Sequence, residues 1–275
     1  MNVELEEHIV IEQNDVTAIE LLSTATGLPR QRIKQAMQKG AVWLTHGNHT
    51  QRLRRATRTF NTGDTIHLYY NEDILSAGPP AAQLIADEQA YSVWYKPCGM
   101  FAQGSKWGDH CTINRWAEQH LQPQRPAFIV HRLDRAASGL ILIAHQKKTA
   151  AALARLFEQR SMDKHYRVIV RGRFPDQEQI IDSDIDGRSA RTIARLLEFD
   201  SQQRCSLLEI KIDSGRKHQI RRHLAERGFS VVGDRLYGND ETIDLQLTAF
   251  SLAFTCPVSG DQKIFQLSEE RLPHL

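Results

Sequence analysis

The clearest change from polar to hydrophobic positions lies near the middle of the chain, in residues 129–144. A short apolar entry meets a polar cluster, and residues 140–144 then form an apolar run rich in β-branched side chains. A run of this length predicts a buried strand, because it is too short for an independent helix. Asp134 lies on the turn before that strand, so its carboxylate needs a hydrogen-bonding or charged partner. Arg132 and Arg135 are the nearest in sequence.

The pattern in the rest of the C-terminal two thirds predicts more strands than helices. Helical spacing of apolar residues occurs at 112–121 and 147–159, whereas strand patterns occur at 92–96, 166–170 and 208–212. No strand–helix–strand repeat of the Rossmann kind is present. We therefore expect an α+β fold with a mixed, mainly antiparallel sheet.

The first third of the chain has a separate pattern. Two short helices are expected at 17–23 and 30–39, and two strands at 41–44 and 65–70. Residues 71–89 break the periodicity with an Ala-Gly-Pro-Pro segment, which is typical of a connection between domains. We expect a small N-terminal α/β domain at 1–76, a linker at 77–90 and a larger domain at 91–275.

Composition and cysteine usage narrow the class of protein. The 275 residues contain no run of 18 or more apolar residues, and the first segment is acidic, unlike a secretory signal. The 4 cysteines are scattered without a CxxC pair, which argues against a disulfide framework or a thiolate metal site. We expect a soluble, cytoplasmic monomer that does not bind membranes.

The net charge of +2 conceals a strong local asymmetry. Residues 21–70 contain eight Lys and Arg against the single acid Asp64, a local charge of +7. A basic surface of this kind suits phosphate groups, because each neutralised phosphate releases counterions. The basic side chains are Arg30, Arg32, Lys34, Lys39, Arg52, Arg54, Arg55 and Arg58.

Taken alone, the polar turn around Asp134 would be a salt-bridged surface turn. However, HRLDRAASGL at 131–140 resembles the signature of the RluA family of RNA pseudouridine synthases, in which HRLD is followed by two variable residues, usually Thr-Ser, Gly and an aliphatic residue. Three further motifs follow in the family's order: DKHYRVIVRG at 163–172, SGRKHQIRRHL at 214–224 and GDRLYG at 233–238. Ala137 stands where the family usually has Thr, which removes no group with an assigned catalytic role.

The resemblance implies roles for individual residues. It implies that Asp134 is the catalytic aspartate, that Arg221 forms an ion pair with it, and that Tyr166 lies against the flipped uracil. Asp134 can act as a nucleophile or as a base that removes a sugar proton, and both routes stay open. Arg132 is expected to fill the gap left in the RNA when the uridine leaves the stack. A basic turn that opens a helix suits phosphate and contains Arg216, Lys217 and His218.

Each of these residues also has a plain structural alternative: Tyr166 as a core aromatic, Arg221 as a charge on a helix surface, Arg132 in a salt bridge. The reaction itself loses no electrons and imports no group, so neither a cofactor nor a metal ion is expected. The sequence is consistent with this expectation, since it has no phosphate-binding glycine loop and its His218 and His223 lie off a common helical face.

The N-terminal pattern of two helices, a glycine and short strands resembles the small S-four type RNA-binding domain, also called the alpha-L type. The residues expected to contact RNA there are Arg30, Arg32, Lys34, Arg52, Arg54, Arg55 and Arg58. The alternative is a basic, solvated face of a generic accessory domain.

We expect ribosomal RNA as the substrate, because family members with an added N-terminal domain mostly act on it, with transfer RNA as the alternative. Two rival functions remain. One is an RNA-binding or ribosome-associated factor without activity, and the other is a glycosidase-type hydrolase that uses two carboxylates. The second lacks an obvious acid partner for Asp134.

Overall fold

The computed structural model describes residues 3–12, 16–58, 60–241 and 243–275. The chain divides into two compact units, and each is described by itself. Residues 1–79 together with 103–116 form the N-terminal unit, and residues 80–102 together with 117–275 form the sheet unit.

The N-terminal unit contains a four-stranded sheet in the order β1-β4-β2-β3, in which every pairing is antiparallel. Ile33 and Met37 of one helix are buried with Leu44, Ile66 and Leu68 of the sheet. The strands are β1 (Glu4–Val10), β2 (Val42–His46), β3 (His49–Arg52) and β4 (Thr65–Asn71), and the helices are α1 (Ala18–Thr26), α2 (Arg30–Gln38) and α3 (Glu72–Ser76).

The expected helices and two of the strands of this unit are present, whereas β1 and β3 were not expected. The exposed positions of β1 are polar except for Val10, and His49–Arg52 is polar throughout. A strand without an apolar stripe gives no period-two hydrophobic signal.

Residues 103–116 were expected in the larger domain but lie in the N-terminal unit. The Asp109 carboxylate forms ion pairs with Arg52, whose Nε lies 3.1 Å from Oδ2, and with Arg54. The Asp109 N–H donates to the Lys39 carbonyl at 3.0 Å, and the indole N–H of Trp43 donates to the backbone of this segment at 3.0 Å. These ionic and main-chain bonds hold a segment distant in sequence to the N-terminal sheet.

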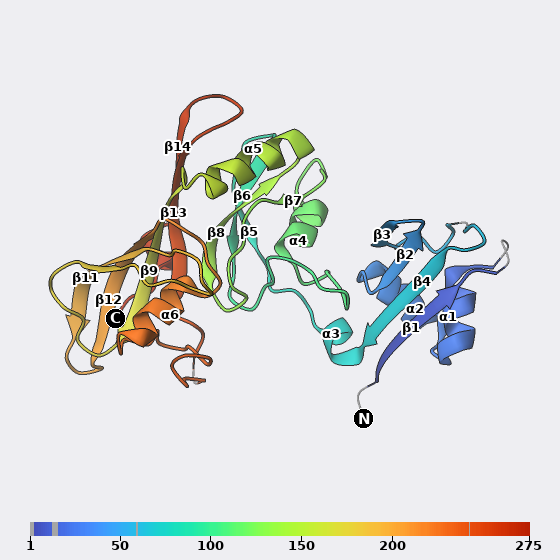
Figure 1. Ribbon diagram of the computed structural model, residues 1–275, viewed down its shortest axis with the longest axis horizontal. Coiled ribbons are helices and arrows are strands. Elements are labelled where there is room, and N and C mark those ends of the chain that lie inside the picture. Colours follow the sequence, from blue (N-terminus) through green and yellow to red (C-terminus); the bar gives the residue numbers. More distant parts are fainter. Residues whose placement is uncertain (1–2, 13–15, 59, 242) are drawn as a thin grey trace. The chain divides into compact units, whose positions relative to one another are not determined.

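The sheet unit is built on one large sheet with the order β10-β11-β12-β9-β13-β8-β6-β5, to which β14 and β7 add at β13 and β8 (Figure 1). All pairings are antiparallel except β13 with β8, so the expected mixed, mainly antiparallel sheet and α+β class are confirmed. The strands are β5 (Gln83–Asp87), β6 (Tyr91–Lys96), β7 (Phe128–Ile129), β8 (Ser138–Ala144), β9 (Asp163–Arg171), β10 (Gln179–Ile181), β11 (Thr192–Asp200), β12 (Cys205–Ile212), β13 (Leu247–Thr255) and β14 (Gln262–Gln266).

Helices are few in this unit. Of the helices, α5 lies against β7 and β8 (Figure 1), and residues of α6 contact residues of β11. Val93, Leu140 and Leu142 of the sheet are buried together with Leu153 of α5 and Phe254 of β13. The helices are α5 (Lys147–Glu158), α6 (Gln219–Glu226) and the short 3₁₀ helix η1 (Glu269–Arg271), while α4 (Ile113–His120) begins in the N-terminal unit and ends in this one.

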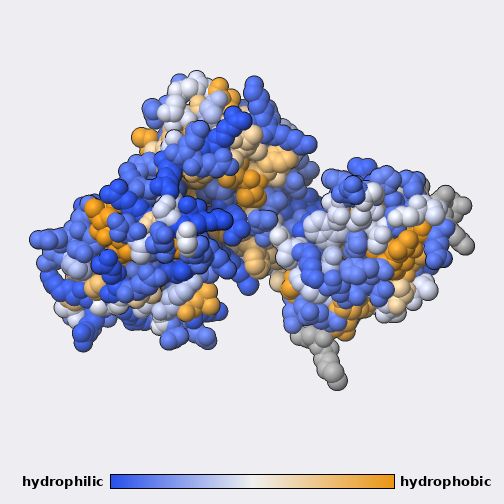
Figure 2. Space-filling view, in the orientation of Figure 1, coloured by the Kyte–Doolittle hydropathy of each residue, from blue (hydrophilic) through white to orange (hydrophobic). Residues whose placement is uncertain are grey.

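The stretch expected as a linker, 77–90, includes β5 at the edge of the large sheet. Its exposed, partly polar residues do not alternate clearly, which explains why the sequence pattern did not reveal a strand. Within the described residues no helix has the length and apolar character needed to cross a membrane. Hydrophilic side chains cover most of the face shown in Figure 2.

One parallel pairing fixes the strand that follows Asp134. Gly139 of β8 pairs with Ala249 of β13 and has a φ of 122°. A Cβ at this position would lie 2.3 Å from the Ala249 carbonyl oxygen, a distance that side chains do not tolerate. Only glycine therefore lets the two backbones approach here.

Candidate active site

Asp134 lies on the loop between β7 and β8, and a quarter of its side chain is exposed. The loop is closed by the Ala137 N–H, which donates to the Asp134 carbonyl at 3.2 Å. The buried ammonium of Lys96 donates to the Ala137 carbonyl at 2.6 Å. The loop is thus anchored through its backbone, so the Ala137 methyl in place of a threonine leaves this support intact.

Arg221 projects from α6 and links two carboxylates. Its Nη1 lies 3.3 Å from Oδ2 of Asp134, as the sequence motif predicted for this pair. Its Nε and Nη2 donate to both oxygens of Asp234, at 2.8 and 2.7 Å. Burial lowers the pKa of Arg221, but its bonds to Asp234 and Asp134 raise it further, so the net pKa lies above its ordinary value. The guanidinium is therefore a permanent, oriented cation.

Asp234 is fully buried and was not expected to serve the site. Its carboxylate also accepts the backbone N–H groups of Leu236, at 2.9 Å, and Tyr237, at 3.1 Å. Burial raises the pKa of Asp234, yet these hydrogen bonds and Arg221 lower it below the ordinary value overall. The GDRLYG motif could have predicted this ion pair, because an acid in a turn bounded by two glycines can be buried against a cation.

Tyr166 lies on β9 and is buried. Burial is the main cause that raises the pKa of its phenol well above the ordinary value, and the Asp134 charge adds to it. The phenol is therefore protonated near neutral pH and can donate a hydrogen bond. Together, Asp134, Tyr166 and Arg221 line one cavity.

His218 lies in the turn that opens α6, as expected, and it also lies close to Asp134. It precedes α6 in a left-handed conformation, with Nε2 3.8 Å from Oδ1 of Asp134. Its Nδ1 lies 3.0 Å from the Tyr237 hydroxyl. Burial lowers its pKa below the ordinary value, although Asp134 opposes this. The imidazole thus faces the carboxylate as well as the cavity.

His131, at the start of the HRLD motif, anchors the loop to β8 and α5. Its Nε2 accepts the Leu142 N–H at 2.9 Å, and its ring stacks on Phe157 at a centroid distance of 4.3 Å. Loss of hydration lowers the pKa of His131 to about 3, and the Lys164 charge acts in the same direction. The ring is therefore neutral at physiological pH.

A wider cavity of about 740 Å³ adjoins the site and shares Arg132, Asp134, Tyr166 and Arg216 with the smaller one. Lys217 lines the wider cavity, as do Lys164 and Arg188, which the sequence patterns did not single out. Arg132 is exposed, whereas Arg216 is tied by Nε to the Ser189 carbonyl at 3.2 Å. The volume and the basic lining suit a nucleotide and its phosphates.

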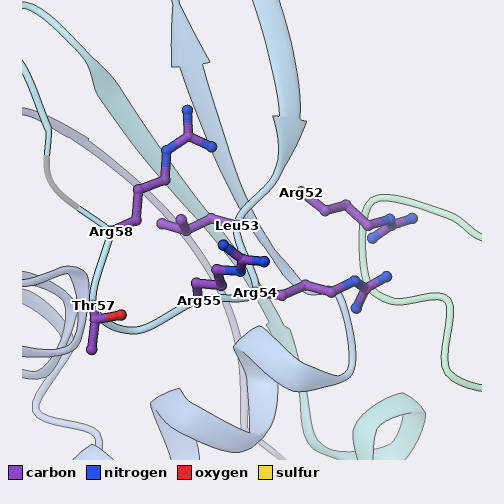
Figure 3. A pocket seen from close by; sticks show the side chains of 6 residues that line it. All are labelled: Arg52, Leu53, Arg54, Arg55, Thr57 and Arg58. Carbon is purple, nitrogen blue, oxygen red and sulfur yellow. The ribbon is translucent and has the colours of Figure 1, made fainter.

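A separate cavity, of about 550 Å³, lies in the N-terminal unit and is lined mainly by arginines (Figure 3). Arg55 and Arg58 are exposed there, whereas Arg52 and Arg54 bond Asp109. The basic residues of α2 are on the surface as well: Arg30 and Arg32 pair with Glu20 and Glu72, and Lys34 is exposed.

Comparison with known proteins places this geometry in a family. The family described as RNA pseudouridylate synthase matches residues 90–226. The dual-specificity RNA pseudouridine synthase RluA of Salmonella typhimurium is 28% identical over 68% of this chain and 93% of its own. The chain belongs to the RluA-type family of RNA pseudouridine synthases. It is thus an isomerase that acts on RNA.

Other relatives of this synthase differ in the share of the chain that they match. An uncharacterized RNA pseudouridine synthase of Aquifex aeolicus is 28% identical over 87% of this chain and 85% of its own. The ribosomal large subunit pseudouridine synthase D of Zymomonas mobilis is 32% identical, over 50% of this chain and 51% of its own. Human RNA pseudouridylate synthase domain containing 1 superposes with a TM-score of 0.60 at 21% identity, covering 72% of this chain and 88% of that protein, which supports the fold.

Among the residues that the structure describes, no cluster of three or more His, Cys, Asp and Glu side chains is arranged to hold a metal ion. The cavity is lined by the Asp134 carboxylate, the Tyr166 phenol and three arginines, Arg132, Arg216 and Arg221.

Proposed function

We propose that this synthase converts specific uridines of structured RNA, in the first place ribosomal RNA, to pseudouridine, with Asp134 as the reacting carboxylate and without a cofactor or metal. The observation that carries the proposal is the Asp134 carboxylate, a quarter exposed and 3.3 Å from a buried arginine, in a cavity shared with Tyr166. The N-terminal unit, we propose further, is an S-four-like RNA-binding domain.

The reaction breaks the bond between N1 of uracil and C1′ of ribose and forms a bond between C5 and C1′. The proton on C5 leaves, N1 gains one, and no electrons are exchanged. An ionised carboxylate suits either a covalent bond to the sugar or removal of a sugar proton. Arg221 fixes the direction of the Asp134 carboxylate, because the second carboxylate, Asp234, prevents the guanidinium from turning.

Tyr166 in this proposal lies against the uracil and donates a hydrogen bond to it. The raised pKa of its phenol supports a neutral donor instead of a phenolate base. Arg132 stacks in the space that the flipped uridine leaves, which its exposed position supports. The phosphates on either side are bound by Arg216, Lys217 and His218.

In the N-terminal unit the proposed RNA contacts are Arg55 and Arg58 in the arginine-lined cavity (Figure 3), with the exposed basic side chains of α2. Arg52 and Arg54 have part of their charge neutralised by Asp109. They contribute to RNA binding mainly by shaping the cavity.

Relatives named for the ribosomal large subunit and one named tRNA pseudouridine synthase C, from Vibrio parahaemolyticus, support RNA as the partner and leave two substrate classes. We favour ribosomal RNA and propose that a cytoplasmic monomer acts on it. The test is carbodiimide-dependent reverse-transcription mapping of pseudouridines with and without the gene. A site lost from ribosomal RNA supports the proposal, and a site lost only from transfer RNA overturns the substrate.

The rival without activity is an RNA-binding factor. RNA labelled with tritium at C5 of uridine separates it from the enzyme, since an isomerase releases tritium and leaves no free base. A hydrolase frees uracil, and a binding factor releases neither.

A further inference from the structure

An exposed aromatic ring lies beside the loop that carries Asp134. Phe101 follows the turn after β6, and 39% of it is exposed. The guanidinium carbon of Arg135, the residue after Asp134, lies 4.5 Å from the centroid of the Phe101 ring. Both residues belong to the sheet unit. Neither has a role in the chemistry described above.

The backbone holds this pair rigidly. The Gly99 N–H donates to the Arg135 carbonyl at 2.8 Å, and Nε of Arg135 donates back to the Gly99 carbonyl at 3.2 Å. The buried Lys96 ammonium donates to the carbonyls of Met100, at 3.0 Å, and Ala137, at 2.6 Å. One lysine therefore ties the turn before Phe101 to the loop of Asp134, so the ring and the site keep a fixed spacing.

A flat ring and a planar cation suit one class of ligand. Single-stranded bases stack on aromatic rings and on arginine planes, and the positive charge favours the neighbouring phosphate. An apolar protein partner fits less well, because it would bury the Arg135 charge without a counterion. A uridine that is flipped into the cavity also leaves its neighbours without their stacking partner.

We propose that Phe101 and Arg135 form a stacking platform for an unpaired base next to the target uridine. This inference rests on the proposed function, since it takes RNA at Asp134 as given. The platform binds the flanking nucleotide and does not take part in the isomerisation.

The test uses the full chain and RNA that carries 2-aminopurine at the positions flanking the uridine. Wild type should quench the fluorescence of one position on binding, and Phe101→Ala should not. Affinity for the RNA should fall about fivefold to hundredfold, as for the loss of one stacked base. Phe101→Tyr should retain both the quenching and the affinity of wild type. The single-turnover rate of Phe101→Ala at saturating RNA should stay near that of wild type.

Phe199→Ala is the matched control, because Phe199 also lies under an arginine, with Arg173 5.0 Å from its centroid, but belongs to β11 and not to the turn beside the Asp134 loop. Unchanged affinity and quenching in Phe101→Ala would overturn the platform, as would an equal loss in Phe199→Ala. Failure of the proposed function is distinguishable, since wild type would then release no tritium whatever the binding results.

Discussion

Two carboxylates share one guanidinium at the centre of this synthase, and their environments differ. Asp234 is buried and holds two nitrogens of Arg221, whereas Asp134 is partly exposed and receives only the third, at 3.3 Å. The tight pair fixes the cation, and the looser contact leaves the Asp134 oxygens accessible. Asp234 is therefore a positioning residue for the proposed reaction.

Asp234→Asn should lower kcat at least about tenfold and leave RNA affinity within about twofold, because Arg221 loses its fixed direction while the RNA surface is unchanged. Unfolding free energy should fall by about 3 kcal/mol, since a buried charge loses its partner. Single-turnover kinetics and urea unfolding measure the two effects. Asp176→Asn, at an exposed pair with Arg173, is the control and should alter neither. A normal kcat in Asp234→Asn would remove the positioning role.

His131 gives the protein a pH-dependent stability. Its folded pKa of about 3 lies below the value near 6.5 of an unfolded histidine, so the unfolded chain takes up a proton first as the pH falls. The contribution is complete above pH 6.5 and is lost progressively towards pH 3. His131→Gln keeps an acceptor for the Leu142 N–H but cannot titrate.

Between pH 6 and 5 the unfolding free energy of wild type should fall more steeply than that of His131→Gln, by about 1 kcal/mol per pH unit. Urea unfolding at both pH values gives the two slopes. Parallel slopes would show that His131 titrates alike in the folded and unfolded states.

The position of the site depends on the parallel pairing of β8 with β13. Asp134 is one turn from Gly139, whose backbone lies against Ala249 in the parallel pairing of the sheet. Any side chain at this point has to push the two strands apart. The position of the Asp134 loop is thus coupled to a strand more than a hundred residues away in sequence.

Gly139→Ala should destabilise the protein by about 3 kcal/mol or more, because a clash with backbone adds to the strain of a positive φ. Gly187→Ala separates the two causes, since Gly187 has a φ of 70° but no atom within 4 Å of its added Cβ. It should cost only about 1 kcal/mol. Equal urea midpoints for the two variants would contradict the close approach.

The elements that the sequence predicted best are those with a strong apolar period. β8, β9, β12 and α5 lie within three residues of their expected bounds, because each buries a run or a stripe of apolar side chains. β1, β3 and β5 were missed because their exposed polar faces leave no clear period.

In the site, the motif residues Asp134, Tyr166 and Arg221 line one cavity, and their roles in the reaction stay predictions. Asp234 lay in the GDRLYG motif but was given no role in the site, because a buried ion pair depends on neighbours that only the fold supplies. The same is true of Lys96, whose carbonyl partners come from two separate turns.

The N-terminal unit includes residues 103–116, which follow the first strands of the sheet unit in the sequence. Deleting residues 1–79 would leave 103–116 without Arg52, Arg54 and the strands that hold it. A truncation therefore disturbs more than RNA binding. Charge variants within the intact chain test the basic cavity more cleanly.

The double variant Arg55→Gln, Arg58→Gln should weaken RNA binding and make the slope of log affinity against log salt shallower, by roughly 0.7 to 0.9 per lost phosphate contact. Titrations at several salt concentrations measure it. Arg173→Gln with Arg195→Gln removes the same charge from surface ion pairs of the sheet unit and should leave the slope unchanged. Identical slopes for both double variants would mean that the arginine-lined cavity does not contact RNA.

We propose that the Asp134 carboxylate, held by Arg221, isomerises uridine. The most direct measurement is tritium release from RNA labelled at C5 of uridine, by wild type and by Asp134→Asn, with binding and melting temperature measured in parallel. Wild type should release tritium without free uracil. Asp134→Asn should bind and melt like wild type yet retain less than about one per cent of the rate, because the change removes only the charge. Release by Asp134→Asn above that level, or free uracil from wild type, would contradict the account.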